Sequence, residues 1–92
     1  MKREDPAEIL RKVGLRLAEL REKRGWSRER FAERLQISVR YLGRLEAGRQ
    51  NLTVHRLAWL ANELGVRVVD LLAEPAIGSI RVGRPPKSPP TR

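Results

Sequence analysis

Residues 27–49 read S-R-E-R-F-A-E-R-L-Q-I-S-V-R-Y-L-G-R-L-E-A-G-R, and this stretch decides the fold. Its apolar residues recur at helical spacing on two separate faces. These residues are Phe31, Ala32 and Leu35 on the first face, and Leu42 and Leu45 on the second. Only Gln36, Ile37 and Ser38 remain to turn the chain between the two patterns. Two short amphipathic helices joined by so tight a turn predict a helix-turn-helix motif.

The second helix of this motif, predicted over residues 38–47, is the one that enters the major groove of DNA. With its leucines turned to the core, its opposite side carries Val39, Arg40, Gly43 and Arg44. An arginine fork holds O6 and N7 of guanine together, and a small apolar side chain such as Val39 touches a thymine methyl group. Gly43 removes side-chain bulk where helix and duplex come closest. The outward face of this helix is therefore suited to reading bases.

The 92-residue chain carries a formal net charge of +9 and has an isoelectric point near 11.4. Polyanions are the expected partners of so basic a small protein. The net charge alone is equally consistent with an arginine-rich surface that only aids solubility. The position of the charges along the chain decides between this interpretation and DNA binding. Residues 38–56 hold one acid, Glu46, and the bases Arg40, Arg44, Arg49 and Arg56. The excess lies on the predicted reading side, and we expect double-stranded DNA as the partner.

The sequence lacks the residues that several other functions need. It has no cysteine, so neither a disulfide nor a thiolate metal site is expected. The one histidine, His55, has no partners at metal-ligand spacing, so we expect it at the surface or against a phosphate. No nucleophile, carboxylate cluster or phosphate-cradling glycine loop is present, so we expect no enzyme, metal or cofactor. No membrane-spanning run and no signal peptide are present, so we expect a cytoplasmic protein with no membrane contact.

Capping residues predict where each helix begins and ends. Side chains that accept hydrogen bonds from a first helical turn stand at Asp5, Ser27, Ser38 and Thr53. Glycines that stop a helix stand at Gly25, Gly48 and Gly65. A brief fifth helix is predicted from Val68 to about Ala73, ahead of Pro75. Residues 6–74 are therefore predicted to form one all-α domain of five helices.

The first helix shows a clear apolar stripe. The stripe consists of Ile9, Leu10, Val13, Leu17 and Leu20. The residues expected on its outer side are Arg16, Glu19, Glu22 and Lys23.

Residues 75–92 are predicted to form a basic, flexible tail that is rich in proline and glycine and has no acid. Ile77, Ile80 and Val82 offer an alternative, in which part of the tail packs on the domain. The segment R-V-G-R-P-P-K at residues 81–87 resembles an AT-hook, which lies in the minor groove of A/T-rich DNA. The other interpretation of this segment is a solvated basic tail that adds affinity for any phosphate backbone.

Residues 13–72 resemble the Cro/repressor-type (XRE-type) helix-turn-helix regulators. The resemblance rests on four motifs in their order along the chain. They are V-G-L-R-L-A-E-L-R before a glycine, S-x-x-x-F-A, S-V-R-Y-L-G-R-L-E-A-G-R and L-A-N-E-L-G-V. The family implies a five-helix, lambda-repressor-like DNA-binding domain, and with it a bacterial or phage protein that joins the nucleoid when bound.

The resemblance also implies roles for individual residues. It assigns base reading to Val39, Arg40 and Arg44, and phosphate contacts to Arg28, Tyr41, Arg49 and Asn51. Gln50 lies between the last two and offers a further amide to a phosphate. The family pattern pairs Glu46 with Arg21 as a structural ion pair that ties the reading helix to the first helix.

Three departures from the family pattern stand out. Arg28 replaces a glutamine that usually helps to position a reading side chain, and Gly43 replaces a small polar residue. Trp59 and Val69 stand where the family usually shows polar residues, which indicates a subunit interface. The alternative is that Trp59 only covers the edge of the core. A symmetric homodimer would place two reading helices about 34–36 Å apart on a near-palindromic operator.

Together these features predict a sequence-specific DNA-binding transcriptional regulator, of the repressor type, that acts as a homodimer through residues 38–47. Two alternatives stay open. One is an antitoxin or protein-interaction module with an unknown protein partner, which binds DNA secondarily. The other is an architectural DNA binder with little sequence choice.

Overall fold

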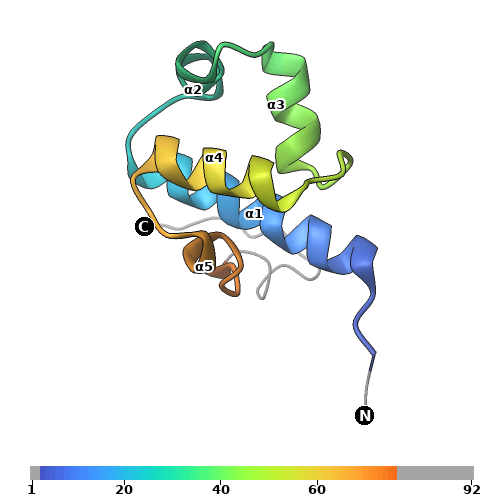
Figure 1. Ribbon diagram of the computed structural model, residues 1–92. Coiled ribbons are helices and arrows are strands. Elements are labelled where there is room, and N and C mark those ends of the chain that lie inside the picture. The colour runs from blue at the N-terminus through green and yellow to red at the C-terminus, as the bar shows by residue number, and fades with distance from the viewer. Residues whose placement is uncertain (1–2, 77–92) are drawn as a thin grey trace, which may run out of the picture.

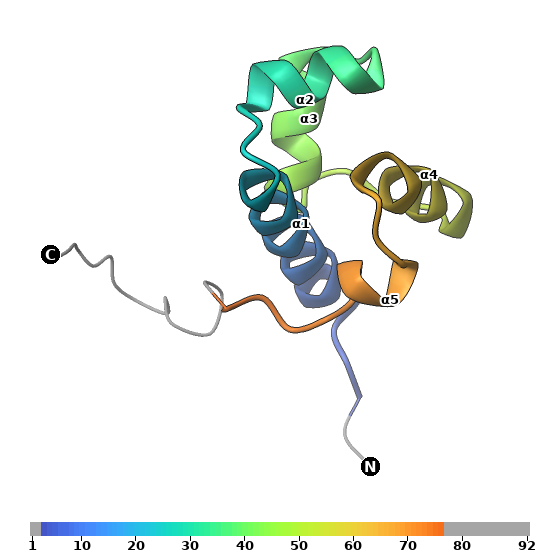
Figure 2. The same cartoon turned by 90° about the vertical axis from the view of Figure 1, so that its left-hand side faces the viewer.

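The computed structural model describes residues 3–76, which form five helices. They are α1 (Pro6–Lys23), α2 (Arg28–Leu35), α3 (Val39–Glu46), α4 (Val54–Leu64) and α5 (Val68–Leu71). Figures 1 and 2 show α2 and α3 at one end of the domain and α5 at the other, with α1 and α4 between them. Residues 3–76 contain no strand, so the prediction of an all-α fold is confirmed. The predicted tail from residue 77 onward, with its AT-hook-like segment, lies outside the described residues.

The four helix starts lie where the capping residues predict them. In each case a side-chain oxygen accepts a hydrogen bond of 3.0–3.1 Å from a backbone N–H in the first turn. The capping residues are Asp5 for α1, Ser27 for α2, Ser38 for α3 and Thr53 for α4. Only Gln36 and Ile37 lie between the last residue of α2 and Ser38, which caps α3, so the connection is a tight turn.

The turn between α2 and α3 includes Gln36, as predicted, but its backbone conformation was not foreseen from the sequence. Gln36 ends α2 in the left-handed conformation, with φ 59°, a region that residues other than glycine seldom adopt. The N–H of Ile37 then donates to the carbonyl of Ala32 over 3.0 Å and closes the end of α2. This reversal directs the chain straight into the Ser38 cap of the next helix.

All helices of the domain contribute to a single core. Its buried members are Leu17, Leu20, Phe31, Ala32, Leu35, Leu42, Leu45, Leu60, Ala61, Leu64 and Leu71. Trp26 is half-buried and stacks on Phe31, with 5.5 Å between the ring centroids. The amphipathic faces of α2 and α3 thus converge on α1 and α4, which is why two helices of eight residues each hold their place.

Backbone contact at two glycines brings the end of α3 against α1. A Cβ atom on Gly14, inside α1, would lie 2.4 Å from the carbonyl oxygen of Glu46 and 2.7 Å from that of Leu45. Gly48 follows α3 at φ +73°, and a Cβ atom there would lie 2.6 Å from the Cα of Arg11. Separations this short are steric clashes, so the close approach of α1 and α3 needs glycine on both sides.

Three expectations for the domain's edges are wrong. The helix α5 ends at Leu71, short of the predicted Ala73, because the N–H of Leu72 turns back to the carbonyl of Val69 over 3.1 Å. Ile9 was expected in the core, but it lies in the first turns of α1 and is 39% exposed.

The third correction concerns the outer side of α1, which the chain after α4 partly covers. Glu19 was expected in solvent but is only 9% exposed. It pairs with Arg16, whose Nε donates to the backbone carbonyl of Asp70 over 2.7 Å. Pro75, the first residue of the predicted tail, is fully buried, so the packed part of the chain includes it.

Candidate nucleic-acid interface

The helix α3 presents two chemically distinct faces. Leu42, Leu45 and Glu46 are buried against α1 and α2. The opposite face carries the side chains predicted to read bases, and Val39, Arg40 and Arg44 are all exposed there. The cap at Ser38 and the packing of the leucines fix which side of the helix is which, because residues three and four apart share a face.

Glu46 is the one acid in residues 38–56, and it is removed from the surface. Its side chain is 4% exposed and accepts from Arg21, with Nε–Oε2 at 2.7 Å and Nη2–Oε1 at 3.2 Å. Arg21 is 8% exposed and also donates from Nη1 to the carbonyl of Trp26 over 2.9 Å. The bidentate geometry and the extra acceptor offset the desolvation of both charges. The ion pair therefore joins the last turn of α3 to α1.

Arg28 shares the same carboxylate. Its Nε donates to Glu46 Oε1 over 3.1 Å, and its side chain is 49% exposed at the first position of α2. Arg28 takes the place of a family glutamine, and here it contacts Glu46. Its guanidinium still reaches the surface beside the N-terminus of α2, a position that favours anions.

Arg44 is held from two sides. Its Nε donates to Gln50 Oε1 over 3.1 Å, and its guanidinium carbon lies 5.6 Å from the centroid of the Tyr41 ring. The N–H of Arg49 donates to the carbonyl of Arg44 over 2.9 Å, so the loop after α3 turns back onto this residue. The sequence marked Gln50 only as an amide for phosphate, since no helical spacing links positions 44 and 50.

The predicted phosphate ligands surround α3. Arg49 and Asn51 are exposed in the loop that follows it. Tyr41 is half-buried and packs against the core on one side of its ring. With Glu46 buried under two arginines, the surface of residues 38–56 has only cationic side chains among its charged groups. The exposed charged side chains of residues 38–56 are therefore all basic.

The predicted dimer residues lie on α4 and α5. Trp59 is half-buried, packs against the core and lies under the guanidinium of Arg56, 4.7 Å from its ring centroid. Trp59 thus has one part packed on the core and another part at the surface. Val69 is 54% exposed on α5, and Leu72, three residues further on, is 53% exposed. The apolar surface at this end of the domain is therefore centred on α5.

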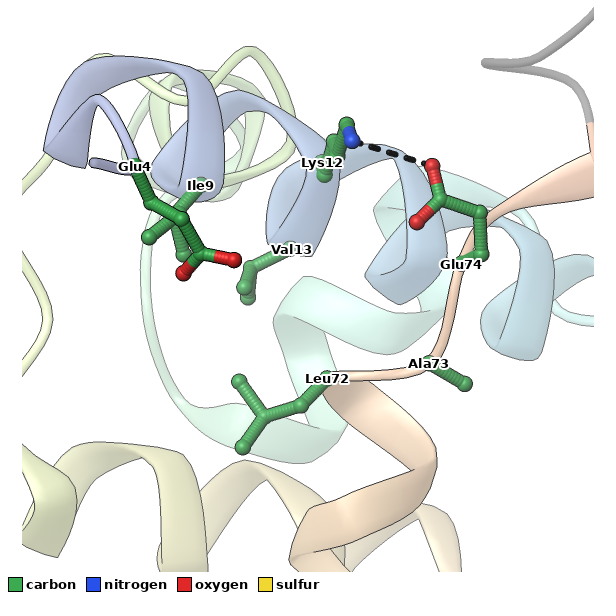
Figure 3. Close-up of a pocket in the computed structure, with 7 residues that line it drawn as sticks. All are labelled: Glu4, Ile9, Lys12, Val13, Leu72, Ala73 and Glu74. Atoms are coloured by element: carbon green, nitrogen blue, oxygen red, sulfur yellow. Dashed lines mark ion pairs between the residues drawn. The ribbon is translucent and has the colours of Figure 1, made fainter. Parts of the chain in front are cut away.

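A pocket of about 290 Å³ lies between α1 and the chain that follows α5 (Figure 3). It is lined by Glu4, Ile9, Lys12, Val13, Leu72, Ala73 and Glu74. The Lys12 ammonium and the Glu74 carboxylate form an ion pair of 3.0 Å across one side. None of the residues predicted to contact DNA lines this pocket, whereas the exposed Leu72 does.

Within residues 3–76, no three acidic or histidine side chains come close enough together to hold a metal ion. Among the described helices, none combines the length and the apolar character needed to cross a bilayer.

A capped pair of short helices, with the second exposing arginines beside a basic loop, defines the class of helix-turn-helix DNA-binding domains. The helix-turn-helix family HTH_3 matches residues 17–71. The chain belongs to this XRE-type family, whose members are DNA-binding transcriptional regulators, and the resemblance drawn from its motifs is confirmed.

Two curated relatives each match more than half of the chain. The HTH-type transcriptional regulator DdrOP3 of Deinococcus deserti is 47% identical over 57 residues, which are 62% of this chain and 44% of that protein. The uncharacterized HTH-type transcriptional regulator y4dJ of Sinorhizobium fredii is 43% identical over 60 residues, 65% of this chain and 78% of its own. The chain thus spans less than half the length of DdrOP3.

Solved structures show the same fold. The restriction-modification controller protein C.AhdI from Aeromonas hydrophila superposes with a TM-score of 0.66 at 32% identity, over 74% of this chain and 99% of that one. The clp gene regulator ClgR from Corynebacterium glutamicum gives a TM-score of 0.65 at 31% identity, over 70% and 82% of the two chains. The five-helix arrangement is therefore that of known regulators.

Proposed function

We propose that the protein is a sequence-specific, non-enzymatic transcriptional regulator that binds a near-palindromic operator as a homodimer, with α3 in the major groove. One observation carries the proposal. The exposed face of α3 bears Arg40 and Arg44 one helical turn apart, while the one acid of residues 38–56 is buried. Such a face suits the acceptor edges of guanine and suffers no repulsion from phosphates.

Phosphate contacts would set the position of α3 in the groove. Arg28 is exposed at the start of α2, Arg49 and Asn51 are exposed in the loop after α3, and the Tyr41 ring lies beside Arg44. Contacts of this kind supply affinity that falls with salt, and they fix the register of the base contacts without choosing a sequence.

Exposed apolar residues in and directly after α5 support a homodimer. Val69 and Leu72 are each more than half exposed, at the end of the domain opposite α2 and α3 (Figures 1 and 2). A two-fold interface there would leave both reading helices free to face one side of a duplex. A role in gene control is supported by the shared fold of the restriction-modification controller C.AhdI and the regulator ClgR.

Replacing Arg44 tests the assignment of base reading. For Arg44→Ala we expect a loss of about 1–3 kcal/mol on the selected operator and a relaxed preference at one base pair, because a bidentate contact to a base edge is lost. Arg49→Ala is the matched control, and it should weaken all sequences alike and lower the salt dependence. The measurement is competition binding with operator and random DNA. Equal losses on both DNAs for Arg44→Ala would show that Arg44 is a backbone contact.

Gly43 tests whether the duplex approaches the backbone of α3. A Cβ atom at Gly43 would meet nothing within 4 Å in the free protein, so the glycine serves no internal packing. We expect Gly43→Ala to stabilise the fold by about 0.8–1 kcal/mol through helix propensity and yet to weaken operator binding. Thermal unfolding and DNA titration of the same sample measure both effects. An alanine variant that binds DNA as tightly as the parent would show that α3 does not approach the duplex at this position.

A further inference from the structure

The side chain of Arg44 is oriented by a residue outside the reading helix. Gln50 lies six positions further along the chain, in the loop after α3, and its Oε1 accepts from Arg44 Nε over 3.1 Å. The backbone N–H of Arg49 binds the Arg44 carbonyl, which ties the same loop to the end of α3. The position of Gln50 relative to Arg44 is thus fixed by the main chain as well as by the side chains.

The atom that Gln50 engages matters for the chemistry of base reading. A guanidinium has five N–H donors, and using the single Nε–H leaves the four on the two terminal nitrogens. Those two nitrogens form the end-on fork that matches a pair of acceptors such as O6 and N7 of guanine. The ring of Tyr41, 5.6 Å from the guanidinium carbon, limits the side chain from another direction.

We propose that Gln50 is a positioning residue that sets the base preference of Arg44, and that the base preferred is guanine. The inference rests on the proposed function, since it presumes that Arg44 faces base edges. A free arginine on a helix surface samples many rotamers and contacts phosphates and bases alike. Held through Nε, the same side chain presents its fork in one direction before DNA arrives, so a mismatched base gains less from it.

Two substitutions separate this role from a direct contact of Gln50 with DNA. Gln50→Leu keeps most of the side-chain bulk and removes the acceptor, whereas Gln50→Glu keeps an acceptor at the same distance and adds a negative charge. Each is made in the parent and in Arg44→Ala. The measurements are affinities for the selected site, for its three single-base variants at the Arg44 position and for random DNA, at two salt concentrations, with thermal unfolding as a check of the fold.

For Gln50→Leu we expect the preference for guanine at that position to fall about 3–10-fold, the range that one hydrogen bond supports. Affinity for random DNA and its salt dependence should stay unchanged, because no charge is altered. Gln50→Glu should retain the guanine preference while binding all DNA more weakly. In the Arg44→Ala background, Gln50→Leu should have no further effect.

Two results would overturn the inference. One is an equal loss on every sequence with Gln50→Leu, repeated in the Arg44→Ala background, which would make Gln50 a DNA contact in its own right. The other is an unchanged guanine preference in Gln50→Leu. Both outcomes leave the proposed function intact, whereas a parent chain that prefers no sequence at all would refute the proposed function and this inference together.

Discussion

Glu46→Gln should destabilise the fold by about 3–5 kcal/mol, since it removes the buried counter-charge of Arg21 and leaves only the exposed carboxylate of Glu22, 3.8 Å away. The side chains of Arg21 and Glu46 are 8% and 4% exposed, so water cannot replace the missing carboxylate. Loss of a few kcal/mol is a large share of the stability of a domain this small. Thermal unfolding measures the effect, with an expected fall of about 4–8 °C in Tm for each kcal/mol lost.

The control for this variant is the ion pair between Lys12 and Glu74. It has a similar length of 3.0 Å, but its side chains are 40% and 66% exposed. Glu74→Gln should therefore change stability by only about 0–1 kcal/mol. Similar effects for Glu46→Gln and Glu74→Gln would show that burial does not distinguish the two pairs, and the view that Glu46 anchors α3 to α1 would be wrong.

Gly14→Ala is expected to have the second large effect. The added Cβ would meet two backbone carbonyls at the end of α3, at 2.4 and 2.7 Å, and backbone cannot swing away as a side chain does. We expect a net loss of about 1–3 kcal/mol, even though alanine favours a helix. DNA binding should fall as well, because α3 must shift on α1 to make room.

Gly43→Ala serves as the matched control, being the same substitution inside another helix of the domain. Nothing lies within 4 Å of its added Cβ, so the two variants should change Tm in opposite directions. Thermal unfolding of both proteins measures the difference. If Gly14→Ala stabilised the chain as Gly43→Ala is expected to do, the contact of α1 with α3 would be looser than the structure has it.

The two large effects share a physical cause. The reading helix has only eight residues, too few to hold its own orientation, so its position comes from α1 through Gly14, Gly48 and the pair of Arg21 with Glu46. Arg28 adds a third donor to the same carboxylate. Under the proposed function, a helix fixed in this way would present Arg40 and Arg44 at one angle to the duplex, which discrimination between bases requires.

The features that could be predicted from the sequence depend on interactions between residues close together in the chain. The starts of α1 to α4 could be predicted because a capping side chain acts within three residues of itself. Ser27 and Ser38 could therefore be identified as N-caps from the sequence. The leucine spacing on α3 likewise determines which side is buried. The family resemblance then supplied roles for the remaining residues, and those roles stay predictions until DNA binding is measured.

What could not be predicted depends on contacts between distant parts of the chain. From the sequence, Gly14 is only an unfavourable residue inside a predicted helix. The need for glycine at this position becomes clear from the close approach of the end of α3. Glu19 looked solvent-facing until the chain after α4 covered it. The link of Gln50 to Arg44 depends on how the loop folds back, which no periodicity encodes. The turn at Gln36 was predicted, but its left-handed conformation was not, because that conformation is uncommon for any residue but glycine.

Selection of bound sequences from a random DNA pool, together with the mass of the purified chain in solution, tests the central claim most directly. We expect a two-fold symmetric site with guanines at the positions that Arg40 and Arg44 face, bound by a dimer. A chain that enriches no motif and binds all DNA alike would contradict the claim and indicate a low-specificity architectural protein instead.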